Sequence, residues 1–174
     1  MSRLRTDPLL TAARLLLYGL GGLFLFAFVM LIIGIGAMLT IERATLISEI
    51  ARVGAPASLF WLLLLAVFLI IIMFAALLKF IQLLLRIIAT VDAGDPFIPD
   101  NVRHLEHLGW LTVAVQIIII ALNGISWVVE RYKPDVGLGG DYSLSGWLLV
   151  LVLFILARVF RHGTNLRAEV EGTV

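Results

Sequence analysis

The chain has 174 residues, of which 61% are hydrophobic and only 14% are charged, and it contains no cysteine. Soluble domains are about 45–50% apolar and about 25% charged, so much of this apolar surface must face lipid rather than water. The formal net charge of +1 argues against a nucleic-acid-binding surface, which would need a concentrated basic face. The absence of cysteine excludes disulfides, thiolate metal sites, iron–sulfur clusters and thiol redox chemistry.

Four apolar runs without charged residues predict four membrane-spanning helices. A helix of about 22 residues is about 33 Å long, which is enough to cross a hydrocarbon core of about 30 Å. The sequence therefore predicts an all-α integral membrane four-helix bundle that forms a single domain over residues 1–174. The predicted spans cover residues 15–41, 57–80, 108–130 and 142–160, with a loop over 86–107 and a tail over 161–174.

The first span is rich in glycine and is followed by a short amphipathic segment. Small residues let helices approach closely in a membrane, so we expect these glycines at helix contacts, with a hinge as the alternative. Next, Leu46, Ile50 and Val53 recur at helical spacing, which favours a short interfacial helix between the first two spans. The glycines of the first span are Gly19, Gly21, Gly22, Gly34 and Gly36.

The distribution of Lys and Arg predicts the orientation of the spans. Four spans place both termini and the segment 79–107 on one side, which carries nine Lys and Arg residues against four on the other. Because cytoplasmic segments are enriched in Lys and Arg, both termini and this segment are expected in the cytoplasm. The nine are Arg3, Arg5, Arg14, Lys79, Arg86, Arg103, Arg158, Arg161 and Arg167, and the four are Arg43, Arg52, Arg131 and Lys133.

The connection between the second and third spans is the most polar part of the chain. The helix of the second span is expected to continue to about Val91 and to end at Gly94 and Pro96. Glycine often follows a helix C-terminus, and proline cannot continue a helix. Asp100 is expected to cap the next helix by accepting hydrogen bonds from its first free backbone N–H groups.

Asp100, His104 and His107 have a spacing compatible with a divalent-metal site. Positions three and four apart share one face of a helix, and carboxylate and imidazole groups are metal ligands. The alternatives are capping by Asp100, solvation of both histidines at the headgroups, and pH sensing. Because such short patterns arise easily by chance, capping and solvation are preferred, and no metal or other cofactor is predicted. His162 also lies at the expected cytoplasmic edge, so haem ligation by histidine within the membrane is excluded.

Five polar residues recur along the third span at intervals that place them near one face of a helix. Because polar groups left unpaired in lipid are costly, this face is expected to point into the bundle. It is interpreted first as a set of interhelical hydrogen bonds, and alternatively as the lining of a path for a ligand or ion. No charged residue lies in mid-span, which argues against a proton relay. The five residues are Thr112, Gln116, Asn123, Ser126 and Glu130.

Two segments contain motifs that resemble those of a known family. Residues 92–97 read Asp-Ala-Gly-Asp-Pro-Phe and are followed by Asn101, Leu105 and Gly109, in the pattern G-x-P-F…N-x-x-x-L-x-x-x-G. Residues 159–163 read Val-Phe-Arg-His-Gly, in the pattern V-F-x-x-G. These patterns resemble the bacterial membrane family called domain of unknown function 2975, although His104 stands where that family has Arg or Lys. The motif residues are Gly94, Pro96, Phe97, Asn101, Leu105, Gly109, Phe160 and Gly163.

The resemblance extends over essentially the whole chain and implies a multi-pass protein of the bacterial inner membrane without an assigned activity. Members of this family are often encoded beside a small helix-turn-helix regulator of the Cro type, which implies such a regulator as a cytoplasmic partner. On this hypothesis the 86–107 loop and the tail form a docking surface with Phe97 as an exposed anchor. The alternative, which we prefer, is that Phe97 caps the helix bundle.

The predicted function is a non-enzymatic membrane protein that binds a regulator or senses a signal at its cytoplasmic face. No nucleophile–base pair, phosphate-binding loop or catalytic pair of carboxylates has a recognisable spacing, so no enzymatic activity is expected. The alternative is a small transporter or permeation unit that uses the polar face of the third span. Four short helices make a thin wall for a pore, so a homo-oligomer is expected in this alternative rather than a monomeric channel. The expected partners are the lipid bilayer, the regulator and further copies of the chain, without direct contact to nucleic acid.

Overall fold

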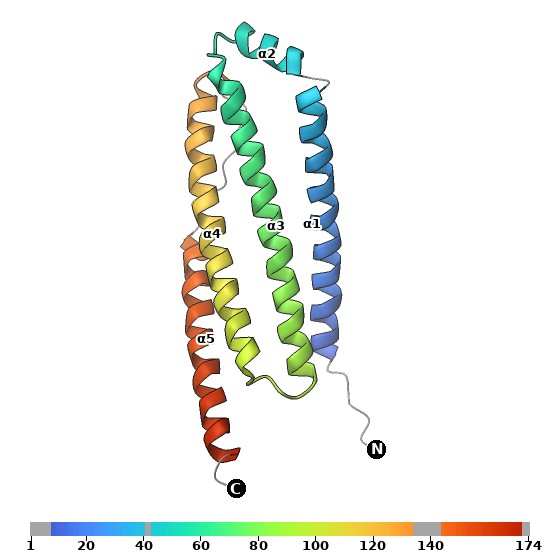
Figure 1. Ribbon diagram of the computed structural model, residues 1–174, viewed down its shortest axis with the longest axis vertical. Coiled ribbons are helices and arrows are strands. Elements are labelled where there is room, and N and C mark those ends of the chain that lie inside the picture. The colour runs from blue at the N-terminus through green and yellow to red at the C-terminus, as the bar shows by residue number, and fades with distance from the viewer. Residues whose placement is uncertain (1–7, 41–42, 134–143, 172–174) are drawn as a thin grey trace. The chain divides into compact units, whose positions relative to one another are not determined.

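The computed structural model describes residues 8–40, 43–133 and 144–171, and helices make up nearly all of these ranges (Figure 1). No strand occurs within them. Four of the described helices are long and apolar enough to cross a membrane, which confirms the predicted all-α membrane bundle. The helices are α1 (Pro8–Thr40), α2 (Arg43–Arg52), α3 (Ser58–Asp92), α4 (Pro99–Glu130) and α5 (Leu144–Glu171).

The long helices extend beyond the predicted spans. α3 continues to Asp92, and α5 continues through most of the predicted tail to Glu171. Within the predicted 86–107 loop, only residues 93–98 are not helical. The helices therefore pass from apolar runs into polar stretches without a break. Arg3, Arg5, residue 41, residues 142–143 and residues 172–174 belong to predicted segments but lie outside the described residues.

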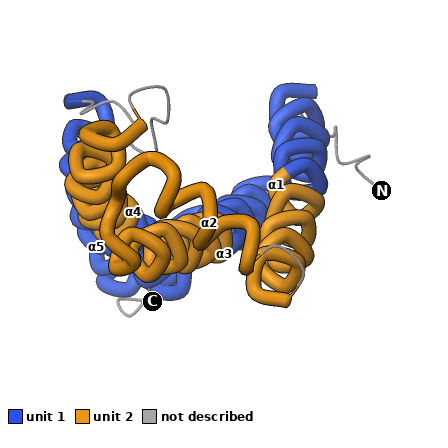
Figure 2. The backbone as a smooth tube through the Cα atoms, turned by 90° about the horizontal axis from the view of Figure 1, so that it is seen from above, with its two compact units in different colours: residues 1–23, 77–113, 144–174 blue, residues 24–76, 114–143 orange. Residues whose placement is uncertain are grey.

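The chain divides into two compact units, which Figure 2 shows in different colours. The first unit comprises residues 1–23, 77–113 and 144–174, and the second comprises residues 24–76 and 114–143. Each unit has its own buried apolar cluster. The cluster of the second unit joins α2, α3 and α4, and that of the first unit joins α3, α4 and α5. They consist of Ile50, Leu59, Phe60, Ala66, Ile118, Leu122, Ile125 and Val129, and of Leu83, Leu105, Leu108, Leu153 and Ala157 respectively.

In the second unit, α2 confirms the short helix predicted after the first span. Ile50 is buried and Leu46 is half-buried, whereas Val53 lies beyond the helix end and is exposed. Gly54 has a φ of 70°, and the backbone N–H of Ala55 donates to the carbonyl of Ile50 at 3.1 Å. This left-handed glycine and its hydrogen bond end the helix in the Schellman arrangement.

Most of the glycines of α1 are not at helix contacts, so that prediction is wrong. A Cβ atom at Gly21 would lie 3.6 Å from Ile81, but a Cβ at the other four would meet no atom within 4 Å among the described residues. In the first unit α1 is also joined to α3 by an ion pair of 3.0 Å between Arg14 and Asp92. Large apolar side chains are exposed along α1, as expected of a helix whose solvent is lipid.

Candidate functional site at the polar ends of α3, α4 and α5

The connection from α3 to α4 begins with a turn at Gly94. Its φ of 80° is a left-handed conformation that glycine adopts without steric cost. The N–H of Gly94 donates to the carbonyl of Val91 at 3.0 Å, and the N–H of Asp95 donates to the carbonyl of Thr90 at 3.0 Å. This Schellman arrangement satisfies the last carbonyls of α3. The prediction that Gly94 and Pro96 end this helix is therefore confirmed.

The prediction that Asp100 caps α4 is wrong. The helix begins at Pro99, so Asp100 already lies in its first turn. Proline suits the first helical position because it has no N–H to leave unpaired and its φ is already helical. The Asp100 carboxylate lies 3.7 Å from the guanidinium of Arg103. Its negative charge is stabilised by the positive N-terminal end of the helix dipole of α4.

Asn101 ties the end of α3, the connection and the start of α4 together. Its side chain is fully buried, with 0% exposure. Its Nδ2 donates to the hydroxyl oxygen of Thr90 at 2.6 Å and to the carbonyl of Pro96 at 2.8 Å. The Thr90 hydroxyl in turn donates to the carbonyl of Ile87 at 2.7 Å. We call this arrangement the Asn101 bridge. It gives the motif asparagine a structural role, because few other side chains supply two donors in so small a space.

Phe97 packs against α5. Its ring centroid is 5.2 Å from that of Phe160, and the rings are tilted by 46°. A Cβ atom at Gly163 would lie 2.7 Å from the Phe97 ring, so the ring occupies the space that any other residue at this position would fill. Two motifs that are far apart in the sequence thus meet at one contact. This geometry favours the interpretation that Phe97 caps the bundle.

A second contact between an aromatic ring and a glycine joins α4 to α5, further from the polar ends of these helices than the Phe97 contact. A Cβ atom at Gly109 would lie 3.0–3.1 Å from three ring atoms of Phe154. The Phe154 ring also packs edge to face against Trp110, with ring centroids 5.6 Å apart and ring planes at 80°. Leu105, also in the motif, is buried in the apolar cluster of this unit. Leu105 and Gly109 of the motif therefore lie where α4 packs against α5.

Two ion pairs join the polar end of α5 to α4 and to the connection between α3 and α4. Arg161 of α5 binds Glu106 of α4, and Arg167 of α5 binds Asp95 of the connection. These side chains are partly exposed, and each such pair contributes about 0.2–1 kcal/mol. Together with the Phe97 contact they hold the end of α5 in one position.

The residues considered for metal binding do not form a metal centre. Across the described ranges, no group of three or more His, Cys, Asp or Glu side chains is placed to hold an ion. His104 is half-buried, and its Nδ1 has no hydrogen-bond partner there. Burial, and next the charge of Arg86, lower the pKa of His104 from its ordinary value, while Asp100 opposes this shift. The neutral imidazole is therefore favoured.

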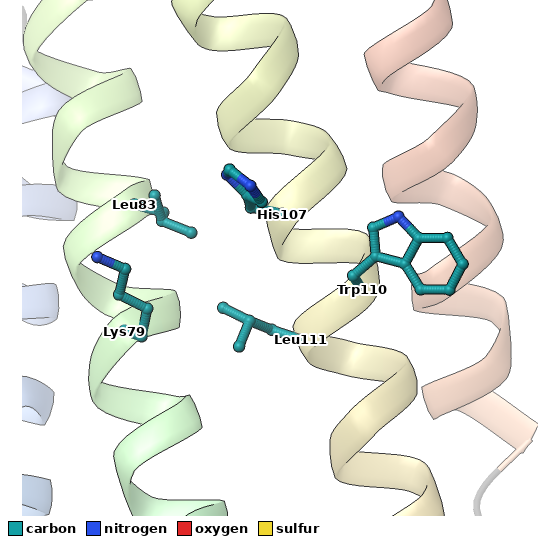
Figure 3. Close-up of a pocket in the computed structure, with 5 residues that line it drawn as sticks. All are labelled: Lys79, Leu83, His107, Trp110 and Leu111. Atoms are coloured by element: carbon teal, nitrogen blue, oxygen red, sulfur yellow. The ribbon is translucent and has the colours of Figure 1, made fainter.

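Two adjoining cavities lie between α3 and α4, and sequence reasoning did not predict them. One is polar, has a volume of about 320 Å³ and is lined by Lys79, Leu83, Arg86, Asp100, Arg103, His104 and His107. The other is mostly apolar, has a volume of about 290 Å³ and is lined by Lys79, Leu83, His107, Trp110 and Leu111. Figure 3 shows that Lys79 and Leu83 of α3 face His107 and Leu111 of α4, with Trp110 on the side of α5. The sequence signal for these cavities was that the lining residues recur three or four positions apart within α3 and within α4.

The polar face predicted for the third span is only partly turned inward. Thr112, Gln116 and Ser126 are buried, Asn123 is half-buried and Glu130 is exposed. The Thr112 hydroxyl donates to the carbonyl of Leu108 at 2.8 Å, and the Ser126 hydroxyl donates to Glu130 at 2.7 Å. These bonds lie within α4 rather than between helices. The Nδ2 of Asn123 is covered but has no acceptor among the described residues.

The fold and these contacts define a multi-pass all-α membrane protein whose motif residues hold α3, α4 and α5 together. Residues 38–174 match the family described as Protein of unknown function (DUF2975). The chain therefore belongs to this family, which confirms the resemblance drawn from its motifs. The match begins near the end of α1, so it covers less of the chain than the resemblance implied. No curated protein and no solved structure matches the chain.

Proposed function

We propose that this protein is a non-enzymatic protein of the bacterial inner membrane that binds a small helix-turn-helix regulator at its cytoplasmic face. The binding surface is the platform formed by residues 93–98 and the end of α5, residues 161–171. In this proposal both termini lie in the cytoplasm, in line with the excess of Lys and Arg on that side.

One observation carries the proposal: α5 continues beyond its apolar run as a helix that is already anchored. Phe97, Arg161 and Arg167 make the anchoring contacts. A surface that is ordered before binding loses less conformational entropy when a partner arrives. Phe97 therefore supports the platform, and its 41% exposure leaves part of the ring available to a partner.

Two apolar side chains on the platform are candidates for direct contact. Leu166 is 50% exposed and Val170 is 68% exposed, although both lie in a polar stretch of α5. Residues four apart share one side of a helix. Apolar side chains exposed in this way are typical anchors for a protein partner.

Replacing Leu166 and Val170 together with Glu should reduce co-purification of the regulator at least tenfold, because the apolar contact is replaced by charge. The measurement is capture of a tagged small helix-turn-helix regulator of the Cro type by the full-length protein in detergent. Ile47→Glu is the matched control, since Ile47 is an exposed apolar residue on α2. Equal capture by both variants, with unchanged melting temperatures, would contradict the proposal.

A permeation unit is the second candidate, and Asn123 supports it. A covered amide donor without an acceptor is suited to a passing polar solute. If this candidate is right, Asn123→Leu should reduce the flux of a small polar solute into proteoliposomes at least tenfold. Asn165→Leu makes the same change on the exposed end of α5 and should leave flux unaltered. Flux that is absent, or unaffected by Asn123→Leu, argues against permeation along this face.

A further inference from the structure

The two cavities between α3 and α4 lie at the boundary of the apolar runs. Lys79 is the first charged residue after the charge-free run 57–78 of α3, and His107 directly precedes the charge-free run that begins at Leu108. Both residues line both cavities. The cavities are therefore placed at the level where phospholipid headgroups meet acyl chains.

The polar cavity carries an excess of positive charge. Its lining contains three basic side chains, Lys79, Arg86 and Arg103, and one acid, Asp100, for a formal net charge of +2 when the histidines are not counted. Asp100 pairs with Arg103. Within the described ranges Lys79 and Arg86 have no acidic partner within 4.0 Å, and both are exposed. Lys79 and Arg86 are seven residues apart on α3, which is about two helical turns, so they share one face of the helix and their long side chains can approach one phosphate group from two sides.

The adjoining cavity offers an apolar surface for the acyl chain of a lipid. Leu83, Leu111 and Trp110 form its apolar lining. Tryptophan is enriched at membrane interfaces because its ring is apolar and its N–H is polar. Because Lys79, Leu83 and His107 are shared, a molecule with a charged head and an apolar chain can occupy both cavities at once. A free anion would leave the apolar cavity without an occupant.

We propose that this pair of cavities binds one anionic phospholipid of the bilayer, with its phosphate between Lys79 and Arg86 and an acyl chain against Leu111 and Trp110. Basic pockets between membrane helices at the cytoplasmic side commonly bind such headgroups. The net charge of +2 selects an anionic lipid over a zwitterionic one. Such a lipid fixes the separation of α3 and α4 beside the Asn101 bridge.

His104 provides a local reporter of occupancy. Its pKa is lowered by burial and then by Arg86, with smaller contributions from His107 and Lys79 in the same direction and from Asp100 in the opposite direction. A bound phosphate neutralises the cations of α3 and raises the pKa of His104 toward its ordinary value. Titration of the imidazole by NMR, with and without lipid, measures this change.

The test uses the full-length protein in detergent with added phosphatidylglycerol or phosphatidylcholine. Phosphatidylglycerol should raise the melting temperature and bind more tightly than phosphatidylcholine. Lys79→Gln and Arg86→Gln should each weaken phosphatidylglycerol binding roughly fivefold, the effect of one basic residue near an anionic lipid. Arg158→Gln is the matched control, because Arg158 is exposed on α5 outside both cavities. Equal weakening by all three substitutions would show general surface attraction and overturn the proposal.

A second measurement does not depend on the folding of those variants. Trp110 is left as the sole tryptophan by Trp61→Phe, Trp127→Phe and Trp147→Phe, and its fluorescence is followed with brominated lipids. Brominated phosphatidylglycerol should quench Trp110 more strongly than brominated phosphatidylcholine at the same mole fraction. Equal quenching by the two lipids overturns the proposal. Inorganic phosphate that displaces phosphatidylglycerol at equal concentration would identify a free-anion site instead and also overturns it.

Discussion

Asn101→Asp should lower the free energy of unfolding by about 3 kcal/mol at neutral pH, because it replaces a buried donor with a buried charge. The new carboxylate would stand beside the carbonyl of Pro96, which accepts from Asn101 at 2.8 Å. Both groups would then be acceptors. The loss is measured as a lower melting temperature and a shifted denaturation midpoint of the full-length protein in detergent.

The pH dependence of this variant has a definite sign. Burial raises the pKa of the introduced carboxyl in the folded state, so the folded state binds the proton more tightly than the unfolded state. Lowering the pH therefore restores part of the lost stability, because the neutral acid can donate to Pro96. Asp100→Asn is the control: Asp100 is exposed, and its change should stay within about 0.5 kcal/mol. If both variants melt alike at pH 7, the Asn101 bridge does not stabilise the fold.

Gly109→Leu should destabilise the contact of α4 with α5 by about 2–3 kcal/mol, because side-chain atoms would enter space held by Phe154. The first added atom alone would lie 3.0 Å from that ring. Movement of the Phe154 ring away from Leu would also disturb its contact with Trp110, whose centroid is 5.6 Å away. Thermal unfolding followed by tryptophan fluorescence measures the loss.

Gly124→Leu is the matched control in the same helix. A Cβ atom at Gly124 meets no described atom within 4 Å, so this variant should unfold within about 1 kcal/mol of the original chain and even gain helix propensity. Phe154→Ala in the Gly109→Leu background should recover part of the loss, because it opens the space that Leu needs. Equal destabilisation at Gly109 and Gly124 would refute the proposed contact.

Helix ends that depend on local chemistry could be predicted from the sequence, and those that depend on competing neighbours could not. Gly94 was identified correctly because a left-handed turn needs glycine whatever surrounds it. Asp100 was assigned as a cap because it is a favourable N-cap residue, but Pro99 starts the helix one residue earlier. The glycines of α1 were expected at contacts, but their number does not determine which helix lies beside them.

The candidate site could likewise be predicted only in part. The motif residues could be recognised as a set, but their roles could not, because each role depends on a partner elsewhere in the chain. Phe97 needs Gly163, Gly109 needs Phe154, and Asn101 needs Thr90. The polar cavity was not predicted for the same reason. Its basic residues were used only to predict the orientation of the spans, and the sequence does not show that Lys79 and Arg86 of α3 lie beside residues 100–107 of α4.

Four membrane-crossing helices, the all-α class and family membership were determined by the sequence alone. The physical reason is that a run of apolar residues long enough to cross lipid is a local property of the chain, as is a motif. Only the tertiary structure decided that the end of α5 lies on the α3–α4 connection and that Lys79 and Arg86 face His104 and His107. These contacts depend on how each helix is rotated about its axis, and that rotation is set by the packing of side chains from several helices together.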